Sequence, residues 1–303
     1  MRALSAAAAL IALLHAGGGC RESTGTADAA QRDSVVLAAR VTRLTEALAK
    51  ATSGAEREKP VARWILPPDL AEISGLALTA DGRLFAHSDE SAKITELDYR
   101  RGTVIKQFFV GKQGFKGDFE GLAFAEDRFF MLASEGTLYE FQEGAAGERV
   151  EFRVHDTHLG KECEFEGVAY DSAASGLVLA CKNVGVTKLR GRIVLYRFAL
   201  GDSGTGKLSE ITVPFAAAIG KNEWKQVRPT DITMDPFNGN FVLVAAQEQA
   251  ILEITPVGEV VFSRPLGKRH PQSEGVAITR DSILIISDEA VKGPATLTLY
   301  RWP

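Results

Sequence analysis

The chain has 303 residues, a formal net charge of −4 at pH 7, and 45% hydrophobic and 24% charged residues. This balance is that of a globular chain that can bury a sizeable core, and it excludes collagen-like, low-complexity and wholly disordered proteins. The pI near 5.8 and the lack of a Lys/Arg-rich run in the sequence exclude nucleic acid as the main partner.

Residues 1–20 have the features of an export signal. Arg2 is followed by an apolar run over residues 3–14 and by three glycines before Cys20. The run is too short to cross a bilayer of about 30 Å as a helix. Small residues before a cysteine resemble a bacterial lipobox, so we expect lipidation of Cys20 and attachment to the periplasmic side of a membrane in the cell envelope. Because Gly17 stands where the lipobox has an aliphatic residue, a soluble periplasmic protein is the alternative.

Residues 21–59 are expected to form a polar linker and a helix ahead of the main domain. Residues 31–51 lack Pro and Gly and are rich in Ala, Leu and Arg, which predicts a helix. Its apolar stripe consists of Leu37, Val41, Leu44 and Leu48 and is too short to indicate a coiled coil. We expect a stalk helix that packs on the domain, with oligomerisation through the stripe as the alternative.

From residue 60 to residue 303 the sequence repeats one pattern, a short apolar run that carries Glu-Gly or a related pair. With the glycine as marker, and Asp231 where it is replaced, the copies are centred on residues 75, 121, 167, 231 and 275. The steps are therefore 46, 46, 64 and 44 residues, which is typical of β-propeller blades. We predict an all-β domain with five blades, and six blades are the alternative.

The repeats also contain further strand-like runs, and two places depart from regularity. The long step is explained by residues 201–226, which open on Gly-Asp-Ser-Gly-Thr-Gly and indicate an insertion between blades. The fifth repeat contains three strand-like runs where the others contain four. We predict that residues 61–66 supply its outer strand and close the ring, which removes the free sheet edges.

The innermost strand of each propeller blade lines the axis, so residues at one repeat position converge there. The position before the marker places five residues in one ring, namely Ser74, Glu120, Glu166, Thr230 and Glu274. Crowded carboxylates repel one another unless a proton or a cation compensates. Oxygen ligands without His or Cys suit Ca²⁺. We therefore predict a calcium site with Glu120, Glu166, Glu274 and Asp118 as metal ligands.

Further polar residues fall near the same mouth of the channel, at the starts of inner strands and the ends of second strands. The candidates for ligand binding in the channel are Ser74, Asp89, Glu135, Lys182, Arg228, Asp231, Glu248, Asp288 and Glu289. In the alternative without a metal, each glutamate only accepts backbone N–H groups of neighbouring blades, because a repeat retains residues for folding as well as for function.

Signals of catalysis are sparse. His87 and His270 lie close in sequence to predicted channel residues, so each is a candidate general base. No Gly-x-Ser-x-Gly elbow, Ser-His-Asp order, phosphate loop or dinucleotide fingerprint occurs in the sequence. A structural histidine is the alternative for both.

Cys163 and Cys181 are the two cysteines beyond the signal. If residues 171–176 form the turn of a hairpin, Cys181 faces Glu166, and Cys163 lies about three positions, or roughly 10 Å, out of register. A disulfide needs Cα atoms within about 7 Å. We therefore expect two buried thiols.

Several motifs in order resemble the SdiA-regulated, or YjiK-like, family of bacterial envelope proteins. The resemblance covers about residues 65–302 and rests on segments 72–76, 165–171, 179–182, 270–275 and 286–289. It implies a β-propeller in the cell envelope and brings no reaction with it. The Glu-Gly repeats also resemble phytase-like esterase propellers and lactonase propellers that hold an axial divalent metal.

Two functions follow as expectations. The first is an envelope-anchored propeller that binds a divalent cation, Ca²⁺, at its central channel and through it an unknown small-molecule or protein ligand. The alternative is a metal-dependent phosphatase, esterase or lactonase-like hydrolase in which the ring glutamates hold the ion. The fold alone does not decide between them, because propellers host binding, scaffolding and hydrolysis.

Overall fold

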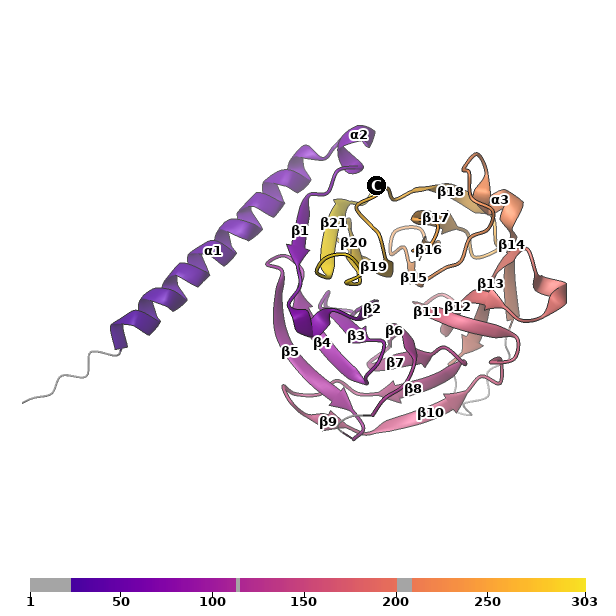
Figure 1. Ribbon diagram of the computed structural model, residues 1–303, viewed down its shortest axis with the longest axis horizontal. Coiled ribbons are helices and arrows are strands. Elements are labelled where there is room, and N and C mark those ends of the chain that lie inside the picture. Colours follow the sequence, from indigo (N-terminus) through magenta and orange to yellow (C-terminus); the bar gives the residue numbers. More distant parts are fainter. Residues whose placement is uncertain (1–22, 113–114, 201–208) are drawn as a thin grey trace, which may run out of the picture.

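A computed structural model describes residues 23–112, 115–200 and 209–303, with side chains from residue 31 onward. The predicted export signal and Cys20 lie outside these residues. The described chain forms five antiparallel sheets arranged around one axis (Figure 1), which confirms the predicted five-bladed β-propeller. An antiparallel meander in each blade explains why strand-like runs recur with the repeat.

The blades follow the chain in order, and each inner strand comes first. Blade 1 contains β2 (Ile73–Leu78), β3 (Leu84–Ser88), β4 (Lys93–Asp98) and β5 (Thr103–Val110). Blade 2 contains β6 (Phe119–Ala125), β7 (Arg128–Ala133), β8 (Thr137–Phe141) and β10 (Phe152–Asp156). Blade 3 contains β11 (Cys163–Asp171), β12 (Gly176–Val184), β13 (Arg192–Ala199) and β14 (Ser209–Pro214). Blade 4 contains β15 (Asp231–Met234), β16 (Phe241–Ala245), β17 (Ala250–Ile254) and β18 (Val260–Pro265).

Blade 5 is closed by the N-terminal side of the chain, as predicted. Its strands are β19 (Ser273–Ile278), β20 (Ile283–Asp288), β21 (Thr296–Arg301) and β1 (Ala62–Ile65). Strand β1 pairs antiparallel with β21, so Ala62 lies opposite Leu299. The ring is therefore held shut by hydrogen bonds between residues more than 230 positions apart.

One predicted run divides in two. The strand-like run at residues 150–154 contributes to two strands, because β9 (Arg149–Val150) pairs in parallel with β5 of blade 1, and β10 pairs with β8 of blade 2. This segment thus joins the outer edges of two neighbouring blades. The remaining elements are short: α2 (Gly54–Arg57), α3 (Phe215–Ile219) and 3₁₀ turns at Pro68–Leu70 and Thr187–Leu189.

Buried apolar clusters join each blade to the next. Between blades 1 and 2, the rings of Phe85, Phe108 and Phe141 surround Phe129, whose centroid lies 4.9 Å from that of Phe85. Burying a side chain of this size stabilises the fold by about 1.5–3 kcal/mol. Neighbouring blades are therefore packed against each other through buried aromatic side chains.

The glycines of the repeat are required by close backbone contact at the axis. A Cβ atom on Gly75 would lie 2.9 Å from the Leu122 nitrogen, and one on Gly121 would lie 2.8 Å from the Val168 nitrogen. Real side chains do not tolerate such distances, so the inner strands approach closely only because this position lacks a side chain.

The residue before each glycine leaves the strand ladder at a β-bulge. In blade 2, Phe119 pairs with Ala133 and Gly121 with Leu132, so Glu120 between them has no partner. The same irregularity skips Glu166 in blade 3 and Glu274 in blade 5. A bulge re-aims a side chain, and here it sets each ring glutamate apart from the regular strand.

The bulge also corrects the expected state of the cysteines. Cys181 pairs with Phe165 instead of Glu166, and the register shifts again between Phe165 and Glu164, so Cys163 pairs with Val184. The Cα atoms of Cys163 and Cys181 are 5.6 Å apart, and the two residues form a disulfide. The prediction of two thiols was wrong because it assumed a regular hairpin.

Helix α1 (Ser23–Lys50) begins eight residues before its predicted start and runs away from the propeller at its N-terminal end (Figure 1). Its C-terminal half packs on blades 1 and 5, where Leu44 is fully buried beside Leu66 and Leu70. The Arg40 guanidinium lies over the Trp64 ring and donates to the Arg101 carbonyl. Among the described residues, no helix is long and apolar enough to span a membrane.

Candidate acidic site at the channel mouth

The ring glutamates gather at the mouth where the inner strands begin. Electrostatic interactions join Glu120 to Glu166, Glu274 and Asp118, so the predicted convergence of these residues on the axis is present. Thr230 completes the ring in blade 4, where its hydroxyl donates to the Ser273 carbonyl at 2.6 Å. Because these side chains are partly or fully buried, water solvates their charges poorly, and ionising several carboxylates together costs free energy.

A lysine on a second strand enters the ring. Lys182, in β12, donates from Nζ to Oε1 of Glu166 at 2.6 Å, and its charge also acts on Glu120 and Glu274. Burial lowers the pKa of Lys182, but the three carboxylates outweigh this effect and raise it. The compensating cation of the ring is thus a side chain of the protein itself.

The three ring glutamates titrate far from their ordinary range. Burial, together with the charges of Glu166 and Asp118, raises the pKa of Glu120 to about 9. Burial also raises the pKa of Glu166 to about 7, a smaller rise because the Lys182 ammonium opposes it. Burial and the charge of Glu166 raise the pKa of Glu274 to about 8. At neutral pH the ring therefore holds protons as well as charges.

A second acidic cluster lies beside the ring, between blades 1 and 5. Oxygens of Glu72, Asp89 and Glu289 all lie within 4.8 Å of one another. Glu72 precedes β2, Asp89 follows β3, and Glu289 follows β20. The Ala290 N–H bonds to the Ala71 carbonyl across the blade boundary, which holds Glu289 beside Glu72. We call Glu72, Asp89 and Glu289 the acidic triad.

The triad has the chemistry of a hard-cation site. All its donors are carboxylate oxygens, and Oδ1 of Asp89 is buried without a hydrogen-bond partner among the described residues. Burial, followed by a hydrogen bond and charge repulsion from Glu72, raises the pKa of Glu289 to about 8. Burial also raises the pKa of Asp89. Such carboxylates bind a divalent cation in competition with protons.

Lys182 connects the ring to the triad, since its charge also lowers the pKa of Glu289. Asp89 and Glu289 were predicted from the sequence to be channel residues, and Glu72 lies two positions before the ring residue Ser74. Only the closure of the ring brings the segment before β2 next to blade 5. The acidic ring and the acidic triad are thus linked through the charge of Lys182, and we treat them as one site.

Most other predicted channel residues have local partners. Asp118 accepts the Ser134 hydroxyl at 2.5 Å, and the Arg228 N–H bonds to the Glu248 carboxylate at 3.1 Å. Glu135 is exposed beyond β7. Ser74 is buried at the ring position of blade 1. Asp118 contributes charge to the ring, whereas Glu135, Arg228 and Glu248 are not brought into it.

Asp231 occupies the axis itself. It replaces the marker glycine in blade 4, is fully buried, and accepts the Val276 N–H at 2.8 Å and the Leu76 N–H. Burial raises the pKa of Asp231 well above its usual range, against the effect of these bonds. Its carboxyl group fastens blade 4 to blades 5 and 1 just below the ring.

The candidate bases His87 and His270 are sealed inside the blades. Both are 0% exposed, and burial lowers the pKa of His87 to about 4. Both ring nitrogens of His270 are occupied, Nδ1 by Asp288 at 2.8 Å and Nε2 by Tyr300 at 2.7 Å. A base must reach its substrate, so neither histidine is retained for that role, and Asp288 is a structural partner.

Comparison with known proteins identifies a fold. No protein-family model and no curated protein matches the chain. Glutaminyl cyclase from Myxococcus xanthus has a TM-score of 0.56 and 16% identity, with 80% of this chain and 94% of that one covered. The PQQ-bound aldose sugar dehydrogenase from Streptomyces coelicolor has a TM-score of 0.50 and 14% identity, with 80% and 97% covered. At such identities the similarity establishes the β-propeller fold alone.

Proposed function

We propose that this protein is a cell-envelope β-propeller that binds a divalent cation, Ca²⁺, at the acidic triad and uses it to hold an anionic ligand at the channel mouth. The observation that carries the proposal is the convergence of Glu72, Asp89 and Glu289 within 4.8 Å. Carboxylate oxygens at irregular angles suit Ca²⁺ better than Mg²⁺ or Zn²⁺.

The proposed ion lies at the triad instead of the ring predicted from the sequence. In the ring, the Lys182 ammonium already lies 2.6 Å from Glu166, so a metal there would have to displace it. The triad contains no such cation among its own members. Lys182 then offers a second positive charge to a ligand that the ion holds, because its charge acts on members of both acidic groups.

The location in the cell is part of the same proposal. The export signal, the lipobox-like Cys20 and the resemblance to the SdiA-regulated family support an anchored protein on the periplasmic side of a membrane. A Cys163–Cys181 disulfide suits an oxidising compartment. Labelling with a radioactive fatty acid, lost in Cys20→Ser, tests the anchor; an unlabelled wild-type protein would contradict it.

A hydrolase is the second candidate, and one observation favours it. Glu120 and Glu166 interact at the same channel mouth, and burial raises the pKa of Glu120 to about 9 and that of Glu166 to about 7. Carboxyl groups whose pKa values are separated in this way can act as general acid and general base. We would test the purified protein for hydrolysis of generic phosphate esters, carboxylic esters and lactones. Activity that is abolished by Glu166→Gln would support a hydrolase. If the wild-type protein hydrolyses none of them, ligand binding remains as the proposed function.

Elemental analysis and melting curves test the proposed cation site. We expect bound calcium in the purified protein and a melting temperature that falls with a chelator and recovers on adding Ca²⁺. An ion present at ten times its Kd stabilises the folded state by about 1.4 kcal/mol. No bound metal, together with no shift in melting temperature, would contradict the proposal.

A further inference from the structure

The opposite end of the propeller axis contains a large cavity that the acidic site does not use. Its volume is about 1220 Å³, and its walls come from all five inner strands and from the turns that follow them. Ligand pockets of proteins commonly measure about 300–1,000 Å³. The cavity is therefore large enough for an organic molecule.

The inner wall of this cavity is apolar. The residue four positions after each member of the acidic ring lines it, which gives the set Leu78, Phe124, Tyr170, Met234 and Ile278. We call this set the apolar ring. The same repeat therefore carries carboxylates at one mouth and apolar side chains at the other. Four of the five side chains, all except Ile278, remain partly exposed.

The two mouths are separated at the axis. The residues that line the cavity lie beyond the repeat glycines and Asp231, and none of them belongs to the acidic ring or the acidic triad. At the glycine level, neighbouring inner strands are in close backbone contact, and Asp231 is fully buried in blade 4. A molecule bound in the cavity would therefore contact neither acidic group. The cavity thus represents a second, independent site.

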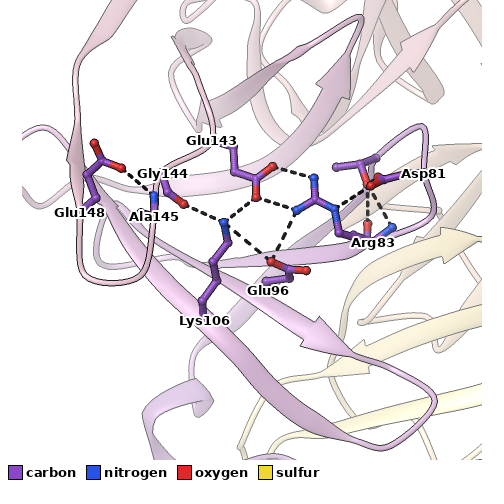
Figure 2. Close-up of polar contacts among 9 residues, drawn as sticks. Asp81, Arg83, Glu96, Lys106, Glu143, Gly144, Ala145 and Glu148 are labelled. Atoms are coloured by element: carbon purple, nitrogen blue, oxygen red, sulfur yellow. Dashed lines mark hydrogen bonds and ion pairs between the residues drawn. The ribbon is translucent and has the colours of Figure 1, made fainter.

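Five of the six acidic side chains that line the cavity form ion pairs with cations, whereas the sixth, the buried Asp235, accepts hydrogen bonds from neutral donors. Figure 2 shows one such group, in which Arg83 bonds to Asp81 and Glu143, while Lys106 bonds to Glu143 and also pairs with Glu96. Around the rest of the rim, Asp98 pairs with Arg101, Glu126 with Arg128 and Asp281 with Arg100, and Asp235 accepts the Trp302 indole N–H.

One cation at the rim is different. Arg280 is exposed and lines the cavity, and within the described chain it forms no hydrogen bond or ion pair. Arg83 and Arg100, the other lining arginines, are both engaged with carboxylates. Among the described lining residues, Arg280 is therefore the cation left available to an anion, and it lies beside the apolar ring.

We propose that this cavity binds a small amphipathic organic anion, with its apolar body against the apolar ring and its carboxylate or sulfonate on Arg280. A guanidinium is suited to such groups because it offers a planar fork of donors. The apolar body supplies most of the binding free energy, and Arg280 selects for the anion.

Two fluorescent probes with the same rings test this proposal. The anionic probe is 8-anilinonaphthalene-1-sulfonate, and the uncharged probe is N-phenyl-1-naphthylamine. We expect saturable binding of both to the purified protein. Arg280→Gln should weaken binding of the anion about tenfold and leave binding of the uncharged probe unchanged.

Two further variants act as controls. Arg190→Gln changes an exposed arginine outside the cavity and should alter neither probe. Met234→Glu places a charge in the apolar ring and should abolish binding of both, with circular dichroism confirming the fold. The proposal would be overturned if the binding of either probe to the wild-type protein did not saturate. It would also be overturned if Arg280→Gln and Arg190→Gln changed the affinity for the anionic probe equally.

Discussion

Lys182 Nζ lies 2.6 Å from Glu166 Oε1, and this ion pair sets the charge of the channel mouth. The lysine comes from the second strand of blade 3, and the glutamate from the bulge of the first. Without this pair, the buried Glu166 and Glu274 and the half-buried Glu120 would have no cation among them within the part of the chain that the structure describes. Lys182 thus stabilises the ring, whereas we propose that the acidic triad beside it binds a cation from solution.

Removing the lysine should destabilise the protein most at alkaline pH. In Lys182→Gln, the pKa of Glu166 rises above its present value of about 7, so more stability is lost as pH increases through that value. We expect a loss of about 2 kcal/mol at pH 8 and a smaller loss at pH 5. Urea denaturation at both values provides the measurement, and Lys188→Gln, an exposed lysine paired with Glu210, is the control.

Glu120→Gln should have the opposite effect. Because the pKa of Glu120 rises from 4.5 to about 9 on folding, the folded protein holds a proton that the unfolded chain releases above pH 4.5. The stability that Glu120 contributes is therefore lost as pH rises toward 9. Glutamine does not titrate, so we expect equal stability at pH 5 and a gain of about 1–3 kcal/mol at pH 8.

The control for this experiment is Asp127→Asn, whose carboxylate is 80% exposed in the wild type. It should show no pH-dependent difference. A gain from Glu120→Gln of the same size at pH 5 and pH 8 would show that packing, not ionisation, is responsible.

The repeat made the five blades predictable from the sequence, because the glycine of each copy is fixed by backbone contact at the axis. The acidic ring followed from the same alignment. Lys182 was also predicted near the channel mouth, from its place at the end of a second strand. Its pairing with Glu166 was not predicted, because that pairing depends on the bulges of β11. The contact of Glu72 with Glu289 depends on closure between the first and last blades.

The disulfide was not predicted from the sequence because the bulges of β11 change the register between the two cysteines. Its contribution to the free energy of unfolding can be measured. The double variant Cys163→Ser/Cys181→Ser releases a loop of 18 residues and should cost about 3 kcal/mol of unfolding free energy. Chemical denaturation with and without reductant gives this value. Two free thiols in the denatured, unreduced mature protein would contradict the assignment.

We expect Asp231 to stabilise the fold at the propeller axis. In Asp231→Ala, the Val276 and Leu76 N–H groups lose their acceptor in a buried place, at a cost of about 1–3 kcal/mol each. Asp231→Asn keeps one acceptor oxygen of similar shape and should cost less. Thermal melts of the two variants compare these effects. Equal losses of melting temperature in both variants would contradict a role for the acceptor oxygen of Asp231.

Calorimetric titration of Ca²⁺ into metal-free protein tests the central claim most directly. We expect one site with a Kd of about 10⁻⁵–10⁻³ M, tighter at pH 8.5 than at pH 7 because Glu289 loses its proton near pH 8. Asp89→Asn should abolish the binding, whereas Glu259→Gln, at an exposed glutamate on the outer part of blade 4, should preserve it. No heat of binding in the wild type, or unchanged binding in Asp89→Asn, would contradict a cation site at the acidic triad.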